Sequence, residues 1–365
     1  MKLECDIEKI KNSVSKVERI TGKNLTLPVL SSILLVASGK SLKLRSTNLS
    51  LGVEIEIPVK IEKEGVLAVS GNILSNVLSN ISEKEKISLE DKDGNLLLKT
   101  KKNQLRIKGN TYEDFPTIPQ VSGNSFEIEG KKLIEGIKSV YYSAAIGDIK
   151  PEISSVFMYG DGEYLVFVAT DSFRLAEKKI KIKGIEEFSG ILIPFKNIPE
   201  IIRVLGETTE IVKVSFNKNQ VSFAFDGVYL TSRVIDGLFP DYRQIIPKEY
   251  KTEVVTLKQD LLNALKISNI FSDKFNQINI KVLPKDKVFE ISSENNDIGD
   301  NKTYLDGALQ GEDVELSFNY RYFLDCFQSL NKDSVSIKFN QSSKPMVVKS
   351  NPDELFTYLI MPMNK

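Results

Sequence analysis

The stretch Leu165-Val166-Phe167-Val168-Ala169-Thr170-Asp171-Ser172 decides the fold, because a weakened copy of it occurs at two other places in the chain. It is a strand-like apolar run that ends in a small polar turn. The turns Ser46-Thr47-Asn48-Leu49 and Ser292-Ser293-Glu294-Asn295 end similar runs, and the three turns follow one another at equal steps of 123 residues. An internal repeat of that length corresponds to a whole domain.

Each repeat opens with a short alternating strand followed by an amphipathic helix. In the first helix Ile7, Ile10, Val14 and Val17 recur at the spacing of one helical face. The opening strands are expected at residues 2–5, 125–128 and 253–256, and a second helix at residues 72–81, 196–205 and 319–330. Hairpin turns are expected at Asp93-Gly94, Asp161-Gly162 and Asp226-Gly227.

The sequence therefore predicts an α+β protein of three topologically similar domains, each with two helices packed on antiparallel sheets. Related turns close the first two repeats at residues 114–116 and 238–241. The expected domains span residues 1–122, 123–250 and 251–365.

The composition excludes several classes of function. Lys and Arg number 49 and Asp and Glu number 49, so the formal net charge is zero and a uniformly basic surface is not expected. There is no histidine, which removes histidine-based nucleophilic catalysis and every histidine-containing zinc site. The two cysteines, Cys5 and Cys326, match no metal-ligand spacing and suit a reducing compartment.

The N-terminus and the hydropathy pattern favour a cytoplasmic protein. Glu4 and Asp6 stand where a signal peptide would have its apolar core. No run approaches the ~18 apolar residues that a membrane-spanning helix needs. A membrane partner, a metal and a cofactor are therefore not expected.

Residues that could carry chemistry are few. Asp171 with a second acid could form the carboxylate pair of a glycoside hydrolase, although a strand-end Asp is more often a turn former and the chain has no Trp for a sugar platform. Gly160 and Gly162 lack the residues of a phosphate-binding loop. Asp297 and Asp300 lack the acid spacing of a calcium loop.

The free helix faces carry positive charge. Lys9, Lys16 and Arg19 recur at helical spacing on the first helix. Lys138, Lys150, Lys196 and Arg203 lie on or beside the helices of the second repeat. Such faces could converge on a phosphate backbone, or they could be ordinary solvated helix surfaces, and the residues alone leave both interpretations open.

Four motifs in order on this triplicated frame resemble the bacterial sliding clamp family, the β subunits of DNA polymerase III. They are residues 26–30 (TLPVL), 169–176 (ATDSFRLA), 236–243 (DGLFPDYR) and 358–363 (YLIMPM). The resemblance runs through the whole chain. It implies a non-enzymatic processivity factor, a ring of two chains with helices lining the hole and sheets outside. Such a ring encircles duplex DNA without sequence preference and tethers the replicative polymerase. A non-encircling oligomeric scaffold is the alternative among binding proteins.

The resemblance also implies three sets of site residues. A cleft that receives short peptides from polymerases, the clamp loader and repair factors would comprise Ile153, Thr170, Ser172, Phe173, Arg174, Leu175, Pro240, Gln244, Ile245, Pro345, Leu359, Ile360, Met361, Pro362 and Met363. The DNA-facing set is Lys9, Lys16, Arg19, Lys23, Asn24, Lys138, Lys150, Lys196 and Arg203. The homodimer contact is Leu105 and Ile107 of domain one against Ile270 and Phe271 of domain three. The four dimer residues could instead be ordinary core, and residues 359–363 a closing strand.

Four positions depart from the family pattern. Phe173 stands where His is frequent, and Gln244 stands where Arg is frequent, which removes a charge-assisted contact to a peptide. Asn24 stands where Arg is frequent. Pro151-Glu152 replaces a Tyr-Tyr pair that touches DNA in some members, with Lys150 beside it as a substitute contact.

Overall fold

The computed structural model describes residues 1–22, 27–82, 86–147, 149–340, 344–353 and 355–363. The chain divides into two compact units, Met1–Leu133 with Lys196–Asp236, and Ile134–Phe195 with Gly237–Lys365. Each unit therefore combines a terminal third of the chain with half of the middle third. The helix α3 (Gly130–Val140) and the 3-10 turn η3 (Phe195–Asn197) cross from one unit to the other.

The first unit contains the helices α1 (Ile7–Glu18), α2 (Gly71–Ser79) and α4 (Ile198–Leu205) and the 3-10 turn η1 (Pro28–Ser31). Its strands are β1 (Lys2–Asp6), β2 (Ser32–Ser38), β3 (Ser41–Thr47), β4 (Leu51–Pro58), β5 (Lys60–Lys63), β6 (Gly65–Ser70), β7 (Lys86–Lys92), β8 (Asn95–Lys99), β9 (Gln104–Ile107), β10 (Gly109–Asn110), β11 (Asn124–Glu129), β16 (Ile211–Phe216), β17 (Gln220–Phe225) and β18 (Val228–Arg233).

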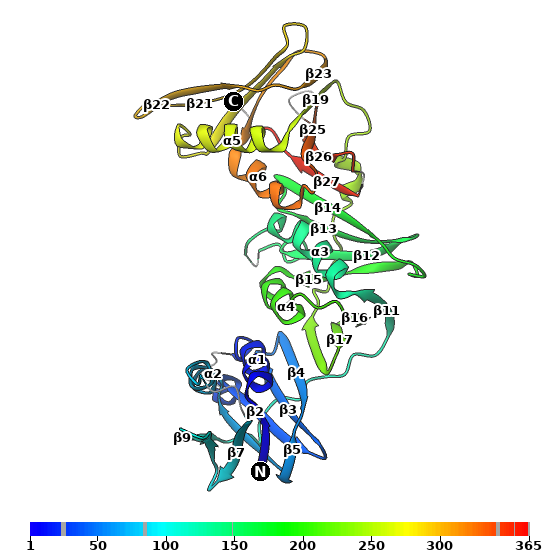
Figure 1. The fold of residues 1–365 in the computed structure, drawn as a ribbon. Helices are drawn as coiled ribbons and strands as arrows, with labels where there is room; N and C mark the ends of the chain where they lie inside the picture. Colours follow the sequence, from blue (N-terminus) through cyan, green and yellow to red (C-terminus); the bar gives the residue numbers. More distant parts are fainter. Residues whose placement is uncertain (23–26, 83–85, 148, 341–343, 354, 364–365) are drawn as a thin grey trace. The chain divides into compact units, whose positions relative to one another are not determined.

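These strands form two antiparallel sheets. One has the order β5-β1-β7-β8-β9, and the other has the order β10-β6-β2-β3-β4-β18-β17-β16-β11. The helices α1 and α2 lie side by side and contact the sheet strands (Figure 1). The predicted apolar stripe of α1 is confirmed, since Ile7, Ile10, Val14 and Val17 are all buried. Asp6 caps the helix by accepting a hydrogen bond from the backbone N–H of Lys9 at 3.1 Å.

The second unit contains the helices α5 (Lys258–Ile270) and α6 (Tyr320–Asp325) and the 3-10 turns η2 (Tyr141–Ser143), η4 (Tyr242–Ile245) and η5 (Cys326–Ser329). Its strands are β12 (Ser155–Asp161), β13 (Tyr164–Thr170), β14 (Arg174–Lys181), β15 (Phe188–Pro194), β19 (Thr252–Leu257), β20 (Gln277–Leu283), β21 (Val288–Asn295), β22 (Gly299–Tyr304), β23 (Ala308–Gly311), β24 (Val314–Asn319), β25 (Ser334–Phe339), β26 (Met346–Asn351) and β27 (Phe356–Ile360).

The second unit also has two antiparallel sheets. Their strand orders are β15-β12-β13-β14-β27-β26-β25-β19-β23 and β22-β21-β20-β24. The pairing of β14 with β27 joins strands that lie far apart in the sequence into one continuous sheet, with Leu175 opposite Leu359 (Figure 1). Apolar side chains from both strands therefore meet in one core, which includes Val166, Val168 and Val347.

The local predictions are confirmed with small shifts. The turn at Asp93-Gly94 has φ values of 52° and 74°, a geometry that favours Gly at the second position, and Lys92 pairs with Asn95 across it. The helix expected at 196–205 begins at Ile198, with Pro199 in its first turn. The helix expected at 319–330 ends at Asp325, and η5 continues it as a tighter turn that brings Ser329 within 3.0 Å of the Ser139 carbonyl.

Candidate functional site

The turn between β13 and β14 is built around the Asp171 carboxylate. Its Oδ1 accepts hydrogen bonds from the backbone N–H groups of Phe173 at 2.9 Å and Arg174 at 3.0 Å, and its Oδ2 accepts from the Arg174 Nε at 2.9 Å. Thr170 Oγ closes the same turn by donating to the Arg174 carbonyl at 2.7 Å. Asp171 is therefore a turn former, and its satisfied carboxylate gives no support to the glycoside hydrolase alternative.

Arg174 links this turn to α6. Its Nη1 donates to Asp325, and its guanidinium lies 4.7 Å from the centre of the Tyr322 ring. The side chain is only 10% exposed. Arg174 belongs to the predicted peptide cleft, but its charge is already paired with Asp171 and Asp325, so it holds two elements together in the free chain.

Three apolar residues of the predicted cleft, which form its floor, are buried. Arg174 pairs with Ile360 and Leu175 with Leu359 across the β14–β27 ladder, and all three apolar side chains are at most 2% exposed. Leu175 and Leu359 belong to an apolar cluster that also contains Tyr242 and Val347.

The C-terminal tail runs across this floor. The backbone N–H of Met361 donates to the Phe173 carbonyl at 2.8 Å, and that of Met363 donates to the Ser317 carbonyl at 2.8 Å. Met361, Pro362 and Met363 are half-buried. The tail is thus tied to the β13–β14 turn at one point and to β24 at another.

The rim of the cleft carries the exposed side chains. Phe173 is 59% and Ile245 48% exposed, and Pro240 and Ser172 are exposed as well. Gln244 donates through its Nε2 to the Asp241 carboxylate at 2.6 Å. Phe173 directly precedes β14, and Ile245 follows Tyr242 of the apolar cluster, so exposed apolar side chains are attached to the buried cluster. Such side chains suit contact with a short apolar peptide segment.

Ile153, Thr170 and Pro345 complete the predicted cleft, and all three are buried. The backbone N–H of Ala145 joins the first two, because it donates to the carbonyls of Ile153 at 3.0 Å and Thr170 at 3.2 Å. Pro345 precedes Met346, which pairs with Ile360. The second unit therefore brings the predicted cleft residues together.

Each of the four sheets ends in two edge strands, and β9 and β22 are two of these. β9 ends the five-stranded sheet of the first unit, and β22 ends the four-stranded sheet of the second. Of the four predicted dimer residues, Ile270 is 61% exposed, Leu105 and Phe271 are half-buried, and Ile107 is buried. Open edges with partly exposed apolar side chains are surfaces that readily pair with another chain.

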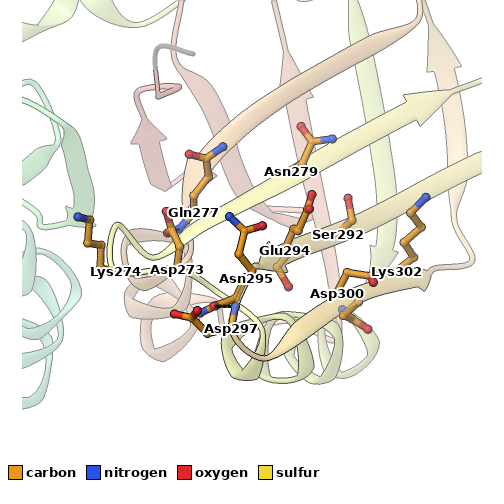
Figure 2. A pocket seen from close by; sticks show the side chains of 13 residues that line it. Asp273, Lys274, Gln277, Asn279, Ser292, Glu294, Asn295, Asp297, Asp300 and Lys302 are labelled. Atoms are coloured by element: carbon orange, nitrogen blue, oxygen red, sulfur yellow. Dashed lines mark hydrogen bonds between the residues drawn. The ribbon is translucent and has the colours of Figure 1, made fainter.

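A hollow lies beside each open strand. In the first unit, a cavity of about 380 Å³ is lined by Asn76, Val77, Asn80, Ile81, Asn103 and Leu105. In the second unit, a polar hollow of about 1030 Å³ follows β20, β21 and β22, with Asp273, Glu294, Asp300 and Lys302 in its lining (Figure 2). No group of three or more His, Cys, Asp or Glu side chains in the described ranges is arranged to hold a metal ion.

The predicted DNA-facing residues divide between the units. Lys9, Arg19 and Lys196 in the first unit and Lys138 and Lys150 in the second are exposed. Lys23 and Asn24 lie outside the described residues.

Arg203 and Lys16 are less available for contact with DNA than their place on the basic helix faces predicts. Arg203 donates from Nη1 to the Ser15 carbonyl at 2.7 Å and from Nη2 to the Lys16 carbonyl at 2.6 Å, and pairs with Glu200. It therefore satisfies the last carbonyls of α1. Burial lowers the pKa of Lys16, and the nearby Arg203 charge acts in the same direction.

Comparison with known proteins identifies the family. Residues 1–119, 127–241 and 243–364 match the models of the N-terminal, central and C-terminal domains of the DNA polymerase III beta subunit. The chain belongs to this family.

The curated relatives and solved structures that are similar to this chain are sliding clamps. A beta sliding clamp of Synechococcus elongatus is 27% identical over 372 residues, which cover 100% of this chain and 99% of the relative. The sliding clamp of Bacillus subtilis has a TM-score of 0.94 at 24% identity, covering 100% of this chain and 99% of that one. A Pseudomonas aeruginosa sliding clamp bound to griselimycin has a TM-score of 0.95 at 24% identity and covers both chains completely.

These matches confirm the predicted family, the three-domain clamp fold and the function of a processivity clamp, an accessory subunit of DNA polymerase III. In the part of the chain that the structure describes, no helix is both long and apolar enough to cross a membrane. The sequence reasoning missed Tyr322, Asp325 and Tyr242, which contact cleft residues, and Glu177, which contacts Tyr242. Only Tyr242 had a sequence signal, because it lies inside the 236–243 motif.

Proposed function

We propose that two copies of the chain close a ring around duplex DNA and so keep DNA polymerase III on its template. The observation that carries the proposal is a strand junction that recurs inside the chain. Each repeat has a first and a second helix, and at least three strands follow each of them. Each junction pairs the third strand after the first helix of one repeat with the third strand after the second helix of the next repeat. β4 pairs with β18 in this way, and β14 with β27. By the same positions in the repeat, the strands left for a third such junction are β22 and β9, and each of them lies at an edge of its sheet.

A ladder of paired residues runs across each repeat from a residue four positions before its first helix. The ladders are Leu3, Leu89, Leu98 and Leu105 in the first repeat, Phe126, Val214, Phe223 and Leu230 in the second, and Val254, Ile337, Val348 and Tyr358 in the third. Leu105, Leu230 and Tyr358 are therefore equivalent.

The opposite strand of each junction, the third strand after the first helix, also has equivalent residues in the three repeats. Ser46 and Ser293 donate from Oγ to the same position of their helices, the carbonyls of Val17 and Ser268. The structural equivalent of Ser46 in the third repeat is therefore Ser293, one residue beyond the position that equal steps of 123 residues predict. In the next strand, Ser46 pairs with Val53 and Ser293 pairs with Asn301. Ala169 occupies the same position in the second repeat, and it pairs with Ala176. Val53 pairs with Leu230 and Ala176 with Tyr358. The same rule pairs Asn301 with the partner subunit's Leu105.

Burial supports this third pairing. Leu230 and Tyr358, the residues equivalent to Leu105, are completely buried in their paired strands. Leu105 is only half-buried, as expected of a residue that lacks the neighbouring strand. Pairing the edges would bury the apolar face of β9 and remove an unpaired edge from each copy.

Helix ends supply the second contact of each junction. Arg203 in the last turn of α4 donates to carbonyls at the end of α1. Ser329 of η5 bonds both the Ser139 carbonyl and the Tyr142 hydroxyl at the end of α3. The remaining helix end is that of α5, which carries the exposed Ile270. Its counterpart is the cavity beside α2, which includes Leu105.

Two copies joined head-to-tail would have six like junctions, and equal heterologous junctions that close make a ring. Retention would then come from topology, so phosphate contacts need only be few and non-specific. Exposed lysines such as Lys9, Lys138 and Lys196 suit such contacts, and so does the zero net charge of the chain. The domain boundaries at residues 122 and 250, a cytoplasmic location and the absence of catalysis belong to the same proposal.

The cleft of the second unit is the proposed docking site for short peptides of the replicative polymerase, the clamp loader and repair polymerases. Phe173, Pro240 and Ile245 provide an exposed apolar rim. Burying two large side chains of a guest would contribute roughly 1.5–3 kcal/mol each, offset by the ordering of the peptide. An affinity of about 1 μM, which corresponds to about −8 kcal/mol, is therefore a ceiling for a peptide alone, and weak binding of this kind suits the exchange of partners.

The test of encirclement is retention after loading. The chain is loaded by a clamp loader onto nicked circular plasmid, and half of the sample is then linearised. We expect protein to stay on circles and leave the linear DNA, because only a free end lets a threaded ring escape. Linear DNA whose ends are blocked by bound streptavidin serves as the control and should retain the protein. Equal retention on circular and open linear DNA would refute encirclement.

A further inference from the structure

A hydrogen-bond network with three buried members, Tyr159, Glu177 and Tyr242, includes part of the turn that carries the rim of the proposed cleft. Tyr242, the first residue of η4, is 5% exposed. Its hydroxyl donates to the Glu177 Oε2 at 2.5 Å and lies 2.7 Å from the Tyr159 hydroxyl. Arg243 donates from Nη2 to the Tyr159 hydroxyl at 2.9 Å and to the Asp161 carboxylate at 2.8 Å. The network thus connects η4 to β12 and β14.

Glu177 is an unusual residue for this position. It follows Leu175 on the same face of β14, and the side chain is only 9% exposed. Lys179 Nζ lies 3.7 Å from its other oxygen. Burial of a carboxylate is unfavourable unless hydrogen bonds compensate it, and an apolar side chain would serve packing better. The Tyr242 hydroxyl provides that compensation, and burial together with the Glu177 charge raises the pKa of Tyr242, which keeps the hydroxyl a donor.

The segment fixed by this bond is the rim itself. Tyr242 lies between Pro240 and the exposed pair Gln244 and Ile245. Phe239 adds a second anchor by stacking on Phe157 at a centroid distance of 4.8 Å. The exposed rim side chains thus belong to a short turn that is held on its buried side by the Phe239 stack and by the bond of Tyr242 to Glu177, and on its exposed side by Arg243.

We propose that Glu177 is a positioning residue of the peptide cleft, which holds the 239–245 turn through Tyr242 at the place where Pro240 and Ile245 meet a bound peptide. This inference rests on the proposed docking function of the cleft. Glu177 does not touch the peptide. It reduces the conformational freedom that the rim loses when a peptide binds, which is how preorganisation raises affinity.

The experiment compares Glu177→Leu with Glu177→Gln in the full-length protein. Leu keeps the volume but removes the acceptor, whereas Gln keeps an oxygen for the Tyr242 hydroxyl. Glu163→Leu is the matched control, because Glu163 is 72% exposed and pairs with Lys181 away from the rim. Griselimycin is the probe, with its affinity measured by calorimetry, alongside the melting temperature and the amide hydrogen exchange of residues 237–247.

We expect E177L to weaken griselimycin binding by about 10-fold, the loss expected for a hydrogen bond to a charged group. Hydrogen exchange should accelerate in residues 237–247 only, with the melting temperature little changed, because the Tyr242 hydroxyl keeps the Tyr159 hydroxyl as a partner. E177Q and E163L should bind within about twofold of the wild type. Unchanged affinity of E177L, or a loss that follows a fall in melting temperature, would refute the positioning role. A wild-type chain that fails to bind griselimycin would instead refute the cleft as a docking site.

Discussion

The closed strand junctions and the open strand edges use different residues at equivalent positions. At the closed junctions Val53 meets Leu230 and Ala176 meets Tyr358, and all four side chains are completely buried. At the open edges the equivalent residues are Asn301 and Leu105, both partly exposed. The outward side chains also differ, since the open edges carry Arg106 on β9 and Asp300 on β22.

We attribute this difference in residue types to the stage of folding or assembly at which each junction forms. A junction within one compact unit is buried as soon as the chain folds, so apolar residues can occupy both strands. In the proposed dimer, an open edge must remain soluble until a second copy arrives, and polar or charged residues would limit wrong pairing during that time. On that proposal, the open edges combine one apolar anchor with charges that would select the partner strand.

The largest effect is expected from a charge at the apolar anchor of the open edge. Leu105→Asp would place an unpaired carboxylate in the buried centre of the proposed β9–β22 junction. We expect the dimer dissociation constant to rise by about 100-fold or more, with the fold retained because Leu105 is partly exposed in the single chain. Light scattering after size exclusion gives the mass, and circular dichroism checks the fold.

Two control variants show whether the loss of the dimer depends on where the new carboxylate lies or only on the introduction of a carboxylate. Ile211→Asp changes a 53% exposed side chain and should leave the dimer unchanged. Leu230→Asp makes the same change at a closed junction and should destabilise the first unit itself, which thermal melting would detect. A dimeric L105D protein would refute the equivalence of Leu105 and Leu230.

An intermediate effect is expected from removal of the tail beside a closed junction. Truncation after Ile360 removes the backbone bonds of Met361 and Met363 to Phe173 and Ser317. We expect griselimycin binding to be lost while the dimer mass stays unchanged, because β27 and both open edges remain. Loss of the dimer would mean that residues 361–365 act as part of the closing strand.

The fold could be predicted from the sequence because its signals are local and repeated. The stripe Ile7, Ile10, Val14 and Val17 and the turn Asp93-Gly94 each specify structure within a few residues. The repeat then predicts that three such units share one topology. The sequence could not show that the middle third is divided between two compact units, because that depends on the pairing of β4 with β18 and β14 with β27.

The site was predictable only where a motif is contiguous. The family motif led to Arg174, but its partner Asp325 lies 151 residues away and no periodicity connects them. Glu177 and Tyr242 are separated by 65 residues and were missed for the same reason. Arg203 fitted the basic helix face, yet its guanidinium satisfies the carbonyls at the end of α1, which helical spacing does not reveal.

The smallest effect is expected from the charges at the open edges. The pairing of Leu105 with Asn301 sets Arg106 opposite Asp300, with Glu294 paired to Asp300 on the neighbouring strand. Because exposed ion pairs are weak, Arg106→Glu or Asp300→Arg should each weaken the dimer by about 5-fold at low salt. The double variant should restore most of the affinity, and 1 M salt should remove the differences.

Lys218→Glu is the control for this charge exchange, because it makes a comparable change at an exposed turn between β16 and β17. It should leave the dimer unchanged at every salt concentration. Restoration by R106E with D300R identifies the register itself, since a shift by one residue would bring Arg106 opposite Gly299 or Asn301 and leave the exchanged charges unpaired. Single variants that weaken the dimer without mutual rescue would therefore contradict the pairing of Leu105 with Asn301, even if β9 and β22 still met.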